Sequence, residues 1–216
     1  MTGTYFLGAN SAQGFYSLYG GFPPRGGFLH IIKGGPGTGK SGFMRAIGAE
    51  AERRGMDVEY VLCSGDPDSL DGVYIPALNT AWVDGTAPHA LDPTIFGVTG
   101  DYVNLGRFCR TPFSPENQEA IRRITPAYKA LYAEGYEHIA AAGKCEVRGD
   151  FDFAPLEKRL DMILRRCPAD GAPYERRVFL RAISCRGLVS LADTLAGYGE
   201  VYEFTSSHGG GAPALE

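Results

Sequence analysis

One short stretch of the chain has the residue types and the spacing of a phosphate-binding loop. It consists of Gly34-Gly35-Pro36-Gly37-Thr38-Gly39-Lys40-Ser41, which fits the pattern G-x-x-x-x-G-K-[ST] at every fixed position. A triphosphate concentrates several negative charges, and Gly34, Gly37 and Gly39 allow the positive φ that turns backbone N–H groups toward them. Lys40 would neutralise the β- and γ-phosphates, and the Ser41 hydroxyl would bind Mg²⁺. The pattern therefore predicts a site for ATP and Mg²⁺.

A carboxylate farther along the chain is the candidate for the second part of this metal site. Residues 80–84 form a largely apolar run that ends in Asp84, as in the element that orients Mg²⁺ through its water shell. Asp66 is a second candidate for the same role. The residue after Asp84 is Gly85, whereas many ATPases that drive motion carry a Glu there to polarise the attacking water. The sequence therefore does not ensure fast hydrolysis.

Other polar side chains follow the expected strands. The loop over 64–72 carries Asp66, Asp68 and Asp71, which can hold Mg²⁺ through water, bind a second substrate, or simply cap turns. His89 follows Asp84 in a loop that could reach the γ-phosphate, where it would position water or an acceptor. A lone loop histidine is more often structural or exposed, so both interpretations of His89 stay open.

The elements around the motif are those that a phosphate-binding loop needs. Residues 27–33 predict a buried strand before it, and residues 41–54 predict a helix that Gly55 stops. Further strands are expected over 57–63, 80–84 and 101–105. Strands that alternate with a helix favour an α/β fold with a mostly parallel sheet, and the motif specifies a P-loop NTPase three-layer sandwich.

Two helical patterns follow. Ser114 and Pro115 open a long helix whose apolar residues recur at helical spacing, and Pro126 is expected to kink it. A second helix is expected over 154–167. Together they predict a helical hairpin at about 114–167, inserted in or packed on the nucleotide domain. Its outer face is a solvated surface by default, with a partner-binding lid as the alternative.

The end of the chain repeats its beginning at an offset of 173. The matched positions are Phe6-Leu7 with Phe179-Leu180, Ala9 with Ala182, Ser11 with Ser184, Gly14 with Gly187, and Ser17-Leu18 with Ser190-Leu191. The same offset takes strand 28–32 to 201–205, but residues 206–213 contain no Gly-Lys-[ST]. We therefore expect a nucleotide domain over 1–170, the start of a truncated second repeat over 174–205, and a Gly/Ala/Pro tail over 206–216.

These motifs together resemble an uncharacterised family of bacterial P-loop ATP-binding proteins with two tandem nucleotide-binding halves. The resemblance covers residues 3–205 and rests on segments 8–17, 34–41, 63–72 and 84–89. It implies ATP binding, with Gly34 to Ser41 as the site. The chain then corresponds to the first half of such a protein and the opening strands of the second.

Composition limits the possible partners and the cellular location of the protein. A net charge of −4 argues against a nucleic-acid partner. The chain has no apolar run of membrane-spanning length, and the N-terminus lacks the regions of a signal peptide, so we expect a cytoplasmic protein without membrane contact. Its 5 cysteines lack a C-x-x-C spacing, which favours reduced thiols over a zinc site or disulfides.

The function that the sequence predicts is Mg²⁺-dependent ATP binding with slow hydrolysis. Lys40 would act on the β/γ charge, with Ser41 and Asp84 on the metal. Two alternatives stay open. A small-molecule or nucleotide kinase would use the 66–71 loop for its acceptor, and a nucleotide-gated interaction module would bind ATP without turnover. A protein partner or self-association would use the helical hairpin or the truncated repeat.

Overall fold

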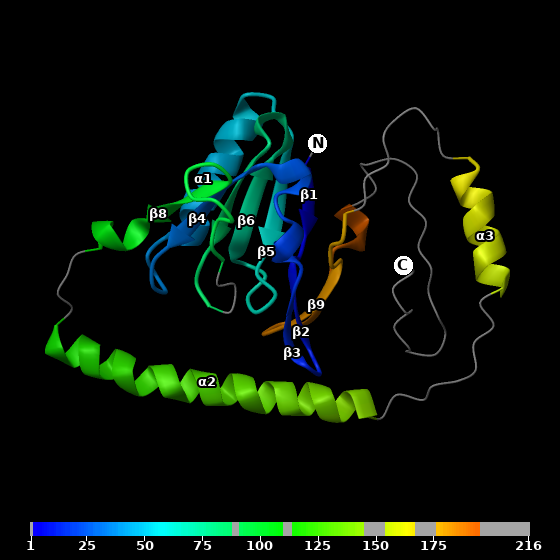
Figure 1. Cartoon of the computed structure of the whole chain (residues 1–216). Coiled ribbons are helices and arrows are strands. Elements are labelled where there is room, and N and C mark those ends of the chain that lie inside the picture. Colours follow the sequence, from blue (N-terminus) through cyan, green and yellow to red (C-terminus); the bar gives the residue numbers. More distant parts are fainter. Residues whose placement is uncertain (1, 88–90, 110–113, 145–153, 167–175, 195–216) are drawn as a thin grey trace.

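The computed structural model describes residues 2–87, 91–109, 114–144, 154–166 and 176–194 (Figure 1). A 6-stranded sheet lies at its centre, in the order β1-β5-β6-β7-β4-β8. The strands are β1 Thr2–Tyr5, β4 Phe28–Lys33, β5 Val58–Leu62, β6 Leu70–Ile75, β7 Thr80–Asp84 and β8 Gly100–Asn104. All pairs are parallel except those of β6, which runs antiparallel to both neighbours. The expected α/β fold with a mostly parallel sheet is confirmed.

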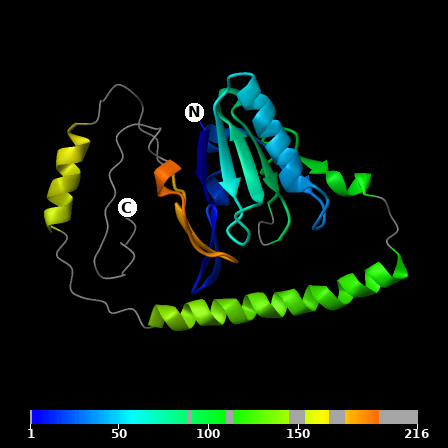
Figure 2. The same cartoon turned by 180° about the vertical axis from the view of Figure 1, so that it is seen from behind.

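One face of this sheet is covered by α1, Lys40–Arg53 (Figure 2). Met44 and Ala51 of α1 are buried against Ile32 of β4 and Val73 of β6. These residues pack because the apolar positions of α1 recur on one side of the helix. The helix ends before Gly55, whose φ of 75° reverses the chain.

The opposite face carries a second apolar cluster, in which Tyr19 and Phe22 pack on Leu29, Ile31 and Val83. The cover there includes the short 3₁₀ turn η1 (Tyr19–Gly21), which η2 (Pro24–Gly26) follows in the chain, and the side chains of Leu18, Leu91, Val178 and Leu180. Among the described residues, no α-helix forms this outer layer. The short turns suffice because their aromatic side chains bury a large apolar area.

The expected loop over 64–72 is wrong at its end, because residues 70–72 belong to strand β6. Cys63 is followed by a tight turn, and the chain re-enters the sheet at Leu70. Every residue of β6 is buried, including Asp71, so the three carboxylates do not share one loop. A strand fits here because Leu70, Val73 and Ile75 supply an apolar face for α1.

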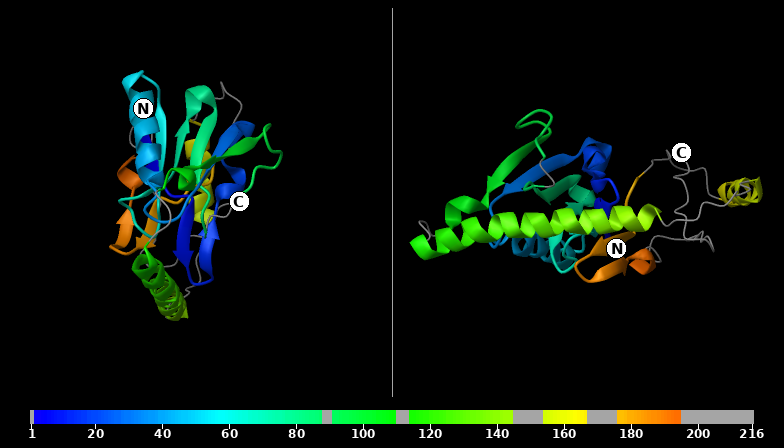
Figure 3. Two further views of the ribbon diagram at one scale, coloured as in Figure 1. Left: turned by 90° about the vertical axis from the view of Figure 1, so that its left-hand side faces the viewer. Right: turned by 90° about the horizontal axis from the view of Figure 1, so that it is seen from below.

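Helices α2 (Pro115–Lys144) and α3 (Ala154–Leu164) do not pack together as the expected helical hairpin. Figure 1 and both views of Figure 3 show α2 crossing the side of the sheet where β4, β5 and β7 end, with α3 well apart from it. Helix α2 contacts the N-terminal part of the chain instead of α3: its Tyr136 hydroxyl donates a hydrogen bond to Asn10 Oδ1 at 3.0 Å. The helix runs through Pro126 as one element. No helix within the described ranges is both long and apolar enough to span a membrane.

Two small β-hairpins complete the fold. The first hairpin joins β2 (Gly8–Ser11) to β3 (Gly14–Ser17), and the second hairpin joins β9 (Arg181–Ser184) to β10 (Gly187–Ser190). The sequence offset of 173 carries each strand of the first hairpin onto a strand of the second. The two segments therefore share one local structure, while the expected strand at 201–205 and the tail at 206–216 lie outside the described residues.

The turns of both hairpins are closed by equivalent hydrogen bonds. Ser11 Oγ donates to Gly14 O at 2.8 Å, and Ser184 Oγ donates to Gly187 O at 3.0 Å. The two copies meet where Phe6 and Phe179, which are equivalent residues, exchange both backbone N–H···O bonds at 2.9 Å. Such a reciprocal pair between equivalent positions is what a local two-fold relation produces.

Candidate functional site

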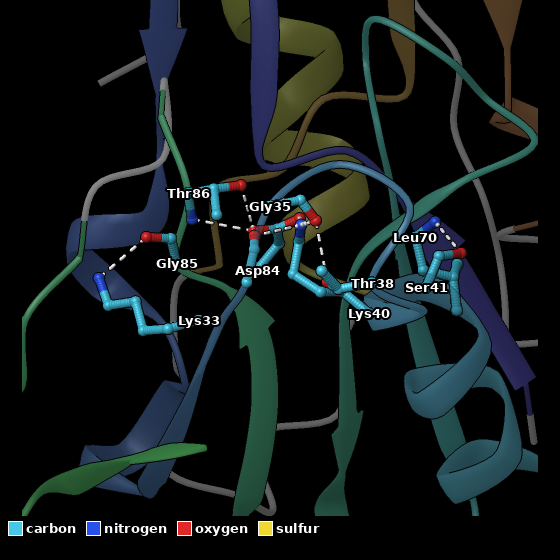
Figure 4. A network of polar contacts seen from close by, with 10 residues as sticks. Lys33, Gly35, Thr38, Lys40, Ser41, Leu70, Asp84, Gly85 and Thr86 are labelled. Carbon is cyan, nitrogen blue, oxygen red and sulfur yellow. Dashed lines mark hydrogen bonds and ion pairs between the residues drawn. The ribbon is translucent and has the colours of Figure 1, made fainter. Parts of the chain in front are cut away.

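The glycine-rich loop lies between the end of β4 and the start of α1 (Figure 4). Because β4 and β7 are adjacent and parallel, with Ile32 paired to Asp84, the last residue of β7 lies at the same edge of the sheet. The N-terminus of α1 adds a partial positive charge there. The fold thus brings Lys40, Ser41 and Asp84 to one place.

Two glycines of the loop adopt the conformation that the pattern requires. Gly37 and Gly39 have φ of 78° and 87°, and Gly39 is the N-cap of α1. Gly34 was expected to share this conformation but does not have a positive φ. It is needed for space, because a Cβ there would lie 2.5 Å from Thr38 Oγ1.

The Lys40 ammonium lies inside the loop rather than in solvent. Its Nζ donates to Gly34 O at 2.8 Å and to Gly35 O at 3.0 Å. Asp84 Oδ2 is 3.6 Å from the same Nζ, and both side chains are largely buried. Thr38 Oγ1 donates to Gly35 O at 2.8 Å and closes the loop. A cation is therefore fixed at the mouth of the loop, where it can face an anion.

Asp84 is held in one orientation by its neighbours. Its Oδ1 accepts hydrogen bonds from the backbone N–H of Thr86 at 2.9 Å and from the Thr86 hydroxyl at 2.5 Å. These bonds leave Oδ2 directed toward Lys40, as Figure 4 shows. A carboxylate fixed in this way can order the water shell of a divalent cation.

Ser41 is tied to β6. Its Oγ accepts the backbone N–H of Leu70 at 2.9 Å. A hydroxyl has two lone pairs and one proton, so one lone pair of Ser41 Oγ stays available for a metal. The described residues contain no group of three or more His, Cys, Asp or Glu that could hold a metal ion by itself. Hard oxygen donors from Ser41 and Asp84 fit Mg²⁺, which usually takes few protein ligands and completes its shell with phosphates and water.

The space beside Asp84 is filled. A Cβ at Gly85 would lie 2.2 Å from Ile31 Cγ2 and 3.1 Å from Lys33 Nζ. Lys33 Nζ donates to Gly85 O at 2.9 Å and to Leu91 O at 3.3 Å. A side chain at position 85 would therefore require Ile31 and Lys33 to move.

Two predicted site residues remain, Asp66 and His89. Asp66 is exposed and organises a turn, accepting from the Ser69 hydroxyl at 2.9 Å and from the Asp68 N–H at 3.2 Å. These bonds match the turn-capping alternative. His89 lies outside the described residues.

Sequence reasoning missed the environment of Asp71 and the role of Lys33. Asp71 is buried near Tyr19 and Cys63. Burial, and to a lesser extent the nearby Asp71 carboxylate, raises the pKa of the Cys63 thiol to about 12. The same two causes raise the pKa of Tyr19 well above its ordinary value. The apolar residues at 70, 73 and 75 were the available signal for a strand.

Comparison with protein-family models, with curated proteins and with solved structures found no match.

Proposed function

We propose that this protein is a P-loop NTPase that binds Mg·ATP at residues 34–41 and hydrolyses it slowly. The observation that supports this most is the 3.6 Å approach of Lys40 Nζ to Asp84 Oδ2, at the end of a loop whose sequence fits the phosphate-binding pattern. A lysine and a hydroxyl from the N-terminus of α1 and a carboxylate from the end of β7 are the groups that a Mg·triphosphate requires.

Each group has a defined part in the proposal. Lys40 exchanges its contacts with loop carbonyls for the β- and γ-phosphate oxygens. Ser41 Oγ supplies one metal ligand, and Asp84, oriented by Thr86, holds the metal's water. The backbone of residues 35–40 surrounds the phosphates. The resemblance to two-half bacterial ATP-binding proteins and a cytoplasmic location belong to the same proposal.

The filled space at Gly85 favours slow turnover. In fast ATPases a polar side chain orients the attacking water, and position 85 cannot carry one because Ile31 Cγ2 and Lys33 occupy the space. The same observation favours a second candidate, a nucleotide-gated interaction module without turnover. The kinase alternative gains nothing here, because Asp71 lies in β6 and does not join Asp66 in one acceptor loop.

The test is ATP affinity by isothermal titration and steady-state phosphate release, both with Mg²⁺. Lys40→Ala is expected to weaken binding by at least about 30-fold, since losing one member of a buried charge contact costs about 2–5 kcal/mol. Asp84→Asn is expected to retain binding and to lose phosphate release. Lys129→Ala, on the exposed surface of α2, is the matched control.

Far-UV circular dichroism must first establish that Lys40→Ala is folded. Unchanged ATP affinity in the folded variant would contradict the site. Binding by the wild type without phosphate release would select the nucleotide-gated module over the ATPase.

A further inference from the structure

The tip of the second hairpin contacts a turn beside the candidate site. The backbone N–H of Cys185 donates to Gly65 O at 3.0 Å, and the Arg186 guanidinium forms an ion pair with the Asp68 carboxylate. Gly65 and Asp68 belong to residues 63–69, which join β5 to β6 and are called the β5–β6 turn below. Two residues of a distant segment therefore hold this turn.

The β5–β6 turn is also attached to the phosphate-binding elements. It leads directly into Leu70, whose N–H is bonded to Ser41 Oγ at 2.9 Å, and Arg45 of α1 donates to Asp68 O. Within the turn, the Ser69 N–H donates to Asp66 O at 2.9 Å and its hydroxyl donates to the Asp66 carboxylate. A turn braced in this way can transmit a displacement from Asp68 to Leu70.

The repeat shows that this contact is not needed to fold a hairpin. At the offset of 173, the counterpart of Arg186 is Gln13 in the first hairpin, which has the same strands and the same closing bonds. A neutral side chain therefore serves that position structurally. The guanidinium is special to the hairpin whose tip lies against Asp68.

We propose that Arg186 is a positioning residue of the nucleotide site. Through Asp68 it fixes the β5–β6 turn, so that the Leu70 N–H occupies one lone pair of Ser41 Oγ and the other lone pair is directed to Mg²⁺. This inference rests on the proposed function. It requires coupling between hairpin docking and Mg²⁺-dependent binding, and such coupling acts equally in both directions.

The experiment compares ATP affinity with and without Mg²⁺ in four proteins: wild type, Arg186→Glu, Asp68→Lys and the double variant with the charges exchanged. Charge reversal at this exposed pair is expected to weaken Mg²⁺-dependent binding about three- to five-fold in each single variant, with Mg²⁺-free affinity changing less than about two-fold. The charge-exchanged double variant is expected to recover most of the loss. Arg181→Glu, on β9 of the same hairpin, is the matched control.

Hydrogen exchange gives a reading of the same coupling in the wild type. The amides of Cys185 and Leu70 are expected to exchange more slowly when Mg·ATP is bound, by a factor comparable to the affinity loss. Equal loss of affinity with and without Mg²⁺, no rescue in the double variant, or unchanged exchange of both amides would overturn the inference.

Failure of the proposed function can be distinguished from failure of the positioning role of Arg186. A wild type that binds no ATP would refute the site itself, together with this inference. Normal ATP binding by Arg186→Glu would refute the positioning role alone.

Discussion

The space around Gly85 makes a quantitative prediction. Gly85→Ala adds one methyl group, and its carbon would lie 2.2 Å from Ile31 Cγ2. Neither Ile31 nor Gly85 can move away easily. Ile31 is fully buried, and Gly85 is held by its own N–H to Ile32 O at 2.9 Å and by Lys33 Nζ on its carbonyl.

We expect Gly85→Ala to lower the free energy of unfolding by about 1–3 kcal/mol, the usual cost of an extra methyl group in a packed core. For a chain of this size, each kcal/mol lowers Tm by about 2–4 °C. Gly85 has no positive φ, so backbone strain does not contribute. Without the contact, a Gly→Ala change would instead stabilise by about 0.4–1 kcal/mol. The sign of the shift therefore decides the question.

The assay is thermal and urea unfolding followed by far-UV circular dichroism. Gly20→Ala is the control, because a Cβ there would meet no atom within 4 Å. In a double-mutant cycle, Ile31→Ala removes the Cγ2 atom and is expected to recover at least about 1 kcal/mol of the Gly85→Ala cost. An unchanged or higher Tm for Gly85→Ala would show that the space is open, and the packing at Gly85 would then no longer favour slow hydrolysis.

Two further predictions concern buried groups. Burial and Asp71 raise the pKa of Cys63 to about 12, so Cys63 stays a thiol at pH 8. An alkylating reagent should therefore modify exposed Cys185 and spare Cys63 until urea unfolds the chain. Modification of Cys63 before unfolding, detected by peptide mass spectrometry, would contradict this prediction. Buried Glu59 accepts a hydrogen bond from Arg176 Nη1 at 2.7 Å. Arg176→Met should therefore lower the free energy of unfolding in urea by about 3–5 kcal/mol, and adding Glu59→Met should restore most of that free energy. A small loss of stability in the single variant would contradict the ion pair.

Local chemistry made much of the site predictable from the sequence. The glycine spacing fixes where the chain can turn tightly, and the apolar runs on either side fix the strand that ends at Lys33 and the helix that begins at Lys40. The position of Asp84 at the same edge followed from a general rule, since parallel strands end together. The offset of 173 predicted that the two ends of the chain are copies, and the structure shows that each copy is a β-hairpin closed by an equivalent serine and glycine.

Other features depended on contacts between distant segments. Asp71 was assigned to a loop, but Val73 and Ile75 draw it into a buried strand that completes the sheet between β5 and β7. The helices α2 and α3 have hairpin-like sequences, yet Tyr136 contacts Asn10 on β2 instead of a partner helix. Helical periodicity shows that an apolar face exists and does not specify what it meets.

Residue types and backbone restrictions over a few positions were enough to predict the glycine-rich loop, its flanking strand and helix, and the candidate roles of Lys40, Ser41 and Asp84. The contacts of Ile31 and Lys33 beside position 85, and of Arg186 with the turn beside Ser41, became visible only in the folded chain. The physical reason is that packing and ion pairing depend on which surfaces the whole fold brings within a few ångströms, and no local pattern encodes that distance.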